Sequence, residues 1–139
     1  MPAEGSKLNY RIIGFSFPKQ NGVKQYKVEI AKGNYLLADS FRKHIVSTSK
    51  SAENKLVAEV PEFGKEYTWK ITYEGAVKKE SQLYHFSTKS NDDVDTSLAK
   101  LKVVKKAEKF KDHYVVLDHG AVIYDMKGNP VWFAPDPRG

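Results

Sequence analysis

Hydrophobic and polar residues alternate along most of the chain before residue 90, as they do in strands with one buried face. The clearest stretch is 66–75, EYTWKITYEG, where every second residue is aromatic or aliphatic. This period of two predicts a half-buried antiparallel strand. The side chains expected in the core are Tyr67, Trp69, Ile71 and Tyr73, and those expected to face solvent are Thr68, Lys70, Thr72 and Glu74.

Three other segments have the same alternation: 25–31 (QYKVEIA), 55–60 (KLVAEV) and 82–88 (QLYHFST). The segment 8–17, LNYRIIGFSF, is apolar on both faces, which predicts a central strand or a strand covered at an edge. The alternation leaves the placement of Tyr35 and Phe41 open. The inward positions of the three alternating segments are Tyr26, Val28, Ile30, Leu56, Ala58, Val60, Tyr84 and Phe86, with His85 facing solvent.

Turn residues separate these segments at short intervals. Glycine and asparagine tolerate the positive φ that tight reversals need. Many short strands with such turns, and no amphipathic helix between them, predict an all-β fold of the sandwich type. The turn signals are Asn21-Gly22, Gly33-Asn34, Pro61 with Gly64, and Gly75.

Residues 7–89 resemble a fibronectin type III domain in the order of their motifs. In VPEFGKEYTWKITYEG a corner with proline and glycine precedes a tyrosine, alternating aromatics follow, and the last strand then ends in Phe-x-Thr. The resemblance implies that Gly64 belongs to the corner, that the Tyr67 ring lies in the core, and that the Tyr67 hydroxyl bonds to the backbone of the preceding loop. It also implies an immunoglobulin-like antiparallel β-sandwich.

The composition changes after Lys89 to the polar, acidic run SNDDVDTS, which predicts a domain boundary. We therefore expect a β-sandwich over 1–89, a linker over 90–112 and a second domain over 113–139. The linker can start a helix at Thr96 or Ser97, or it can hold an extended strand. An extended connector is favoured.

The last segment contains three strand-like pieces, at 114–118 (YVVLD), 121–125 (AVIYD) and 130–135 (PVWFAP). Between the last two, DMKGN at 125–129 predicts a hairpin turn in which Gly128 and Asn129 accept the left-handed conformation. Pro130 fits only the start of a strand or an edge strand. A strand, then D-x-x-G-N, then Val-Trp is typical of many β-propeller blades, and a single blade cannot bury both of its faces. We expect neighbouring blades to cover Trp132.

Residues 95–137 are similar to the beginning of the propeller in bacterial aryl-sulfate sulfotransferases, whose propeller follows a small β-sandwich domain. The resemblance implies a non-catalytic N-terminal module of an enzyme that moves sulfate from an aryl sulfate to a phenol. Such a module contributes packing, homo-oligomer contacts or a rim over the active site, and its partner is the remainder of the propeller. We accordingly expect a fragment that is cut just inside its second domain, with an incomplete propeller blade.

The same resemblance implies a periplasmic or extracellular parent protein, with no signal peptide in the opening MPAEGSKLNY. The family's catalytic histidine and its charged neighbours belong to later parts of the propeller, so no catalytic residue is assigned in this chain. The alternative is a carbohydrate- or protein-binding β-sandwich module of an extracytoplasmic protein. A small stand-alone enzyme ranks last, because no charged constellation supports one.

The composition excludes several kinds of functional site. The chain has 139 residues, of which 40% are hydrophobic, and this is enough apolar surface to form a core. The absence of cysteine excludes disulfides, a thiolate nucleophile and cysteine-based metal sites. No run approaches the ~20 apolar residues of a membrane span.

Many of the lysines behind the net charge of +6 fall within 100–111. Apart from Phe110 they have no stacking aromatics, so we expect no nucleic-acid partner.

The remaining polar residues give no catalytic, cofactor-binding or metal-binding candidate. His113 and His119 lie at opposite ends of a predicted strand, too far apart to share a metal ion. His44 is expected on the surface. The alternating carboxylates within 92–95 lack the glycine and the terminal glutamate of an EF-hand calcium loop, so a solvated linker is expected there. The residues assigned a structural role are Gly64, Tyr67, Trp69, Gly128 and Trp132.

Overall fold

A computed structural model describes residues 1–90, 108–117 and 122–133. Apart from one short α-helix and one 3-10 turn, its elements are strands, so the fold is all-β as the sequence predicts. The chain divides into two compact units, Met1–Lys89 and Ser90–Gly139. The front unit and the second unit are each described by themselves.

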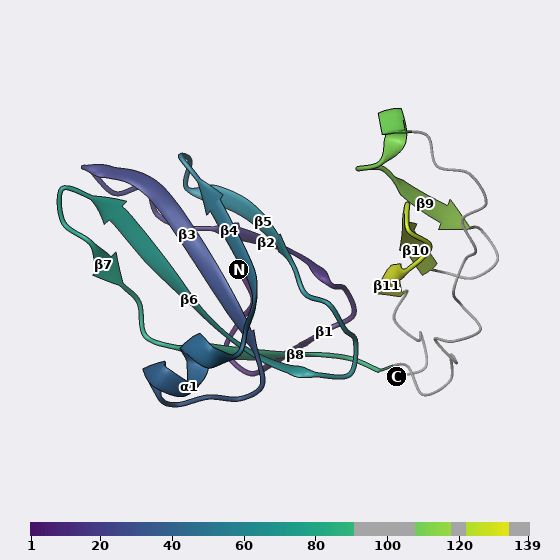
Figure 1. The fold of residues 1–139 in the computed structure, drawn as a ribbon, viewed down its shortest axis with the longest axis horizontal. Helices are drawn as coiled ribbons and strands as arrows, with labels where there is room; N and C mark the ends of the chain where they lie inside the picture. Colours follow the sequence, from purple (N-terminus) through teal and green to yellow (C-terminus); the bar gives the residue numbers. More distant parts are fainter. Residues whose placement is uncertain (91–107, 118–121, 134–139) are drawn as a thin grey trace. The chain divides into compact units, whose positions relative to one another are not determined.

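The front unit contains β1 (Ser6–Leu8), β2 (Ile12–Ser16), β3 (Val23–Lys32), α1 (Ala38–Lys43), β4 (Ile45–Ser51), β5 (Lys55–Glu59), β6 (Glu66–Gly75), β7 (Lys79–Glu80) and β8 (Tyr84–Thr88). Its larger sheet has the strand order β1-β8-β6-β3-β4, and β7 pairs with the end of β6. The strands of this sheet are antiparallel to their neighbours except β1, which runs parallel to β8 (Figure 1). A smaller antiparallel sheet consists of β2 and β5.

The core of the front unit lies between these two sheets. Phe15 of the smaller sheet meets Trp69 of the larger one edge to face, with ring centroids 4.9 Å apart. Burying each large apolar side chain contributes about 1.5–3 kcal/mol, so this cluster is the main source of stability. The alternation in the sequence is confirmed, because its inward residues are buried except Tyr73 and Tyr84, which are partly buried. The buried cluster consists of Leu8, Ile13, Phe15, Phe17, Tyr26, Val28, Ile30, Leu56, Ala58, Val60, Tyr67, Trp69, Ile71 and Phe86.

The opening segment differs from its prediction. Instead of forming one strand, residues 8–17 change sheets between Leu8 and Ile12, so that β1 belongs to the larger sheet and β2 to the smaller one. The buried positions change parity at this point, from Leu8 to Ile13 and Phe15. This change of parity explains why the segment looks apolar on both faces when it is read as a single strand.

The outer face of β6 also differs from its prediction. The alternation predicts that Thr68, Lys70 and Thr72 face solvent, but all three are buried. The loop after β3 covers part of this face, where the Thr68 hydroxyl donates to the Gly33 carbonyl at 2.7 Å and accepts from the Tyr35 amide at 2.9 Å. The helix α1 covers more of it (Figure 1). This helix was not predicted, because six residues are too few to show a helical period.

The second unit contains η1 (Glu108–Phe110), β9 (Tyr114–Leu117), β10 (Val122–Asp125) and β11 (Pro130–Phe133). Its strands form an antiparallel sheet in the order β11-β10-β9, at the three strand-like pieces of the sequence. Pro130 begins a strand, as predicted. Most of the predicted linker 90–112, including the possible helix start, lies outside the described residues.

Candidate functional site

A groove of about 500 Å³ lies on the outer face of the larger sheet. Its lining comes from α1 and the loop before it, from β6, and from β7, β8 and the stretch between them. The residues that line it are Leu36, Ala38, Phe41, Lys70, Glu80, Ser81, Gln82, Leu83 and His85.

Lys70 places a buried charge in this groove. Its ammonium lies 3.3 Å from the Glu80 carboxylate, 3.8 Å from the Glu29 carboxylate and 5.5 Å from the centre of the Phe41 ring. These partners compensate for the hydration that a lysine loses when it is buried. Burial opposes ionisation of Glu80, but Lys70 and then Lys78 outweigh it and lower the pKa of the carboxyl. The groove therefore contains a paired ion cluster.

His85 connects three segments at the edge of the groove. Its Nδ1 lies 2.8 Å from the carboxylate of Glu4, which precedes β1, and its Nε2 lies 2.8 Å from the carbonyl oxygen of Tyr35, in the loop before α1. The His85 backbone amide donates to the other Glu4 oxygen at 2.8 Å. His85 lies outside the core, as the alternation predicts, but only 20% of its side chain is exposed because these contacts cover the rest.

The electrostatics of this contact favour a charged pair. Both ring nitrogens of His85 face oxygen acceptors, so only the imidazolium form can donate to both. Burial lowers the pKa of His85, but the Tyr35 carbonyl and the Glu4 carboxylate outweigh it, and the pKa rises above its ordinary value of 6.5. Hydrogen bonds from the His85 backbone and then its ring hold the pKa of Glu4 below 4.5. At a pH between the lowered pKa of Glu4 and the raised pKa of His85, both groups are charged.

Leu36 and Leu37 form an apolar rim beside the groove. They are 83% and 69% exposed, although a leucine side chain is usually covered in a folded protein. Leu36 lines the groove, and Leu37 is the first residue before α1, where it makes no side-chain cap. An apolar rim beside an ion cluster suits a ligand that has both an apolar part and a polar part.

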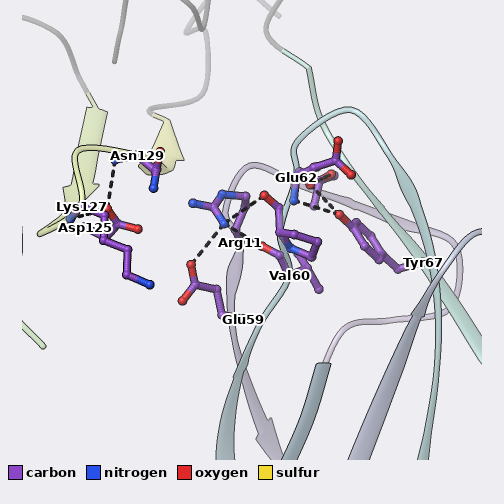
Figure 2. Close-up of polar contacts among 10 residues, drawn as sticks. Arg11, Glu59, Val60, Glu62, Tyr67, Asp125, Lys127 and Asn129 are labelled. Atoms are coloured by element: carbon purple, nitrogen blue, oxygen red, sulfur yellow. Dashed lines mark hydrogen bonds and ion pairs between the residues drawn. The ribbon is translucent and has the colours of Figure 1, made fainter. Parts of the chain in front are cut away.

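The corner between β5 and β6 holds two of the five residues to which the sequence assigns a structural role, Gly64 and Tyr67, and Figure 2 shows the Tyr67 contact. The Tyr67 ring is fully buried, and its hydroxyl donates to the Glu62 carbonyl at 2.8 Å and accepts from the Glu62 amide at 3.1 Å. Burial raises the pKa of Tyr67. Gly64 has a φ of 67°, which suits glycine, and its amide donates to the Thr88 carbonyl at 3.1 Å. The Tyr67 hydroxyl thus fastens the loop to the strand, as the sequence predicts.

Replacing Tyr67 with phenylalanine is expected to lower the free energy of unfolding by about 1–2 kcal/mol, because the Glu62 amide loses its partner while the ring keeps its place. Urea denaturation followed by circular dichroism measures this change. Tyr73→Phe is the matched control on the same face of β6, where the tyrosine is only partly buried. It should change stability by less than about 0.5 kcal/mol. Equal effects of the two substitutions would show that the corner hydrogen bonds add nothing.

Arg11 is buried where the chain passes from β1 to β2 (Figure 2). Its Nη1 donates to the Val60 carbonyl at 2.7 Å and to the Glu59 carboxylate at 3.1 Å. The guanidinium carbon also lies 5.6 Å from the centre of the Phe63 ring. These contacts tie the start of β2 to β5 and the loop after it, so Arg11 has a structural role.

Asp125 organises the turn between β10 and β11 (Figure 2). Its carboxylate accepts hydrogen bonds from the amides of Lys127 and Asn129, both at 2.9 Å. Gly128 has a φ of 86°, the left-handed conformation that the sequence predicts for it. Trp132 lies on β11 and is partly buried.

The other histidines and the acidic run give no further site. His44 is exposed, as predicted, and stacks on the Tyr35 ring with centroids 4.7 Å apart. His113 is also exposed, while His119 and the carboxylates within 92–95 lie outside the described residues. In the part of the chain that the structure describes, no three His, Asp or Glu side chains gather as metal ligands do.

The groove residues are the ones that sequence reasoning missed. Lys70 alternates with core aromatics, so its pattern is that of a solvated lysine. The sequence gives no signal for α1, which has only six residues and buries only Phe41. Glu4 gives no signal, because it precedes the first predicted strand and meets His85 only through the tertiary fold.

Comparisons of the chain with protein-family models, with curated proteins and with solved structures find no match. Among the helices that the structure describes, none has the length and apolar character of a membrane span. Any functional proposal therefore depends on the residues of the chain itself.

Proposed function

We propose that the chain is a non-catalytic module of a β-propeller enzyme that resembles the aryl-sulfate sulfotransferases. In this proposal the front unit is a fibronectin type III-like β-sandwich, and β9 to β11 are the first strands of a propeller blade. One observation carries the proposal: the β9–β11 sheet has large apolar side chains on both of its faces.

The two faces of this sheet differ in burial, but each carries large apolar side chains. Val122 pairs with Phe133 and Ile123 pairs with Trp132, so each pair marks one face. A sheet with two apolar faces needs a covering layer on each side, and propeller blades, which stack face to face, supply both layers. The buried residues of one face are Val122, Tyr124, Val131 and Phe133, and the partly buried residues of the other are Ile123 and Trp132.

The proposed sandwich is supported by strand order and by the corner. In an immunoglobulin-like domain two antiparallel sheets enclose one core, and a tyrosine at the corner before a central strand bonds back to the preceding loop. Here the β1-β8-β6-β3-β4 sheet faces the β2–β5 pair across one core. The Tyr67 hydroxyl bonds to the Glu62 backbone at the corner before β6.

The role proposed for the front unit is packing, homo-oligomer contact or a rim over an active site. Its partner is the set of neighbouring blades, which would also hold the residues that transfer sulfate from an aryl sulfate to a phenol. A periplasmic or extracellular location belongs to the same proposal, and the resemblance of residues 95–137 to the sulfotransferases supports it.

The test compares this chain with a longer polypeptide in which further blades follow. In this chain acrylamide should quench the fluorescence of Trp132, which is only partly buried, but not that of Trp69, which is 1% exposed. The Trp132→Phe variant should therefore lose the quenchable part of the emission. In the longer polypeptide acrylamide should no longer quench Trp132. Only the longer polypeptide should transfer sulfate from a fluorogenic aryl sulfate to phenol. Turnover by this chain alone, or equal quenching of Trp132 in both proteins, would contradict the proposal.

A second candidate function, a carbohydrate- or protein-binding module, is favoured by the groove and its exposed rim. Leu36 lines the groove, whereas Val77 is similarly exposed, at 79%, and does not line it. Binding to a glycan or peptide array that Leu36→Ser abolishes and Val77→Ser preserves would support this candidate.

A further inference from the structure

The N-terminal segment is held at the edge of the larger sheet by a short strand and by contacts to His85. The strand β1 has only three residues, and it pairs with the edge of the sheet, where strands open most easily. The Gly5 amide donates to the His85 carbonyl at 2.9 Å. The side chain of Glu4 bonds to both the ring and the backbone amide of His85. The Glu4 contact is therefore one of the ties that fix this segment, beside the burial of Pro2 and Leu8 and the hydrogen bond from the Lys89 amide to the Leu8 carbonyl at 2.7 Å.

We propose that His85 is a pH-sensitive latch, which holds the N-terminal segment and the loop before α1 on the larger sheet while its ring is protonated and releases one of them when the ring loses its proton. His85 also lines the groove, so the latch fixes part of the groove wall. The titratable and charged groups around the latch are Glu4 before β1, Glu66 on β6, His44 stacked on Tyr35, and the Lys70–Glu80 pair in the groove.

A neutral ring cannot satisfy both neighbours of His85. Neutral imidazole has one N–H group and one lone pair, on different nitrogens. Whichever nitrogen keeps the proton, the other directs its lone pair at an oxygen 2.8 Å away, on Glu4 or on Tyr35. Two acceptors at that distance repel each other, so one contact must open. Loss of the Glu4 contact weakens the hold on the N-terminal segment, and loss of the Tyr35 contact weakens the hold on the loop that carries Leu36.

The direction of both pKa shifts defines the pH range in which the latch is closed. The pKa of folded His85 lies above 6.5, so its stabilising effect is complete below pH 6.5 and is lost as the pH rises through the raised pKa. The pKa of folded Glu4 lies below 4.5, so its effect is present above pH 4.5 and is lost as the pH falls through the lowered pKa. The latch is therefore strongest between pH 4.5 and pH 6.5.

An NMR titration of this chain tests the latch. The nitrogen shifts of the His85 ring should show both nitrogens protonated in slightly acidic solution and a titration midpoint above 6.5. As the pH rises through that midpoint, protection against hydrogen exchange should fall either at the Gly5 and His85 amides, if the N-terminal segment is released, or at the Tyr35 amide, if the loop is released. The loss should reach about tenfold for each unit by which the pKa is raised. The Val28 amide, in the middle of β3, should keep its protection.

Two variants separate a latch from a contact that is merely structural. The Glu4 side chain is 58% exposed, so Glu4→Gln should fold and should lower the midpoint of His85. In His85→Gln the glutamine amide still donates a hydrogen bond, but it has no proton to lose in this pH range. Once corrected for the intrinsic exchange rate, the protection of the Gly5 amide should therefore not depend on pH between 6 and 9. A midpoint at or below 6.5 in the unaltered chain would overturn the proposal. So would protection of the Gly5 and Tyr35 amides that is independent of pH at both positions in that chain, or a His85 midpoint that Glu4→Gln leaves unchanged.

Discussion

Replacing Trp69 with alanine is expected to lower the free energy of unfolding by about 3–5 kcal/mol. The side chain is 1% exposed, and its ring centroid lies 4.9 Å from that of Phe15 and 4.8 Å from that of Tyr84. Alanine leaves a cavity between the two sheets of the front unit and removes both ring contacts. Because a domain is stable by only about 5–15 kcal/mol, the variant retains little of its stability.

Far-ultraviolet circular dichroism in urea is the appropriate measurement for Trp69→Ala, because the substitution removes a fluorophore. Val57→Ala is the control, since Val57 lies on β5 of the facing sheet but is 60% exposed. This control should change stability by less than about 0.5 kcal/mol. A loss below about 1 kcal/mol for Trp69→Ala would mean that the two sheets do not close over this residue.

The strand β6 illustrates what the sequence can predict. Alternation of large apolar and polar residues has one physical cause, the burial of one face, and Tyr67, Trp69 and Ile71 are buried for that reason. Turn chemistry is equally local, because Gly64 and Gly128 adopt a positive φ at the reversals where their sequences predict it. Both signals involve residues that are close in sequence, so neither depends on the remainder of the fold.

The opposite face of β6 illustrates where prediction ends. A period of two places Lys70 away from the core, but it does not say whether water or another layer of protein lies there. In the structure α1 and the loop after β3 cover this face, and Lys70 is compensated by Glu29 and Glu80. An alternating polar residue is therefore compatible with a solvated face and also with a covered layer of ion pairs.

The candidate site depends on contacts between more distant residues. Glu4 and His85 are 81 residues apart, and they meet because β1 runs parallel to β8. A strand of three residues has too few positions to show a period, so the sequence predicts neither this strand nor its direction. The groove and the latch can be recognised only when the order of the strands is known.

Gly75→Ala is expected to lower the free energy of unfolding by about 1–3 kcal/mol, through a steric clash with the backbone of another segment. A Cβ added at Gly75 would lie 2.1 Å from the Gly22 carbonyl oxygen and 3.3 Å from the Val23 Cα. These are backbone atoms, so no side chain can rotate away to make room. The turn between β2 and β3 would have to move away from the end of β6, where Val23 pairs with Gly75. Gly22 already has a φ of 81° in that turn, which limits the conformations that would relieve the clash.

Gly14→Ala is the matched control for this prediction. Gly14 lies on β2, where an added Cβ would meet no atom of the described residues within 4 Å beyond its two chain neighbours, and its φ is outside the left-handed region. Alanine there should raise the free energy of unfolding by about 0.4–1 kcal/mol, because it restricts the unfolded chain. The urea midpoints of the two variants should therefore lie on opposite sides of that of the unaltered chain. If Gly75→Ala were as stable as Gly14→Ala, the turn between β2 and β3 would be free to shift, and the register of β3 on β6 would depend on side-chain packing alone.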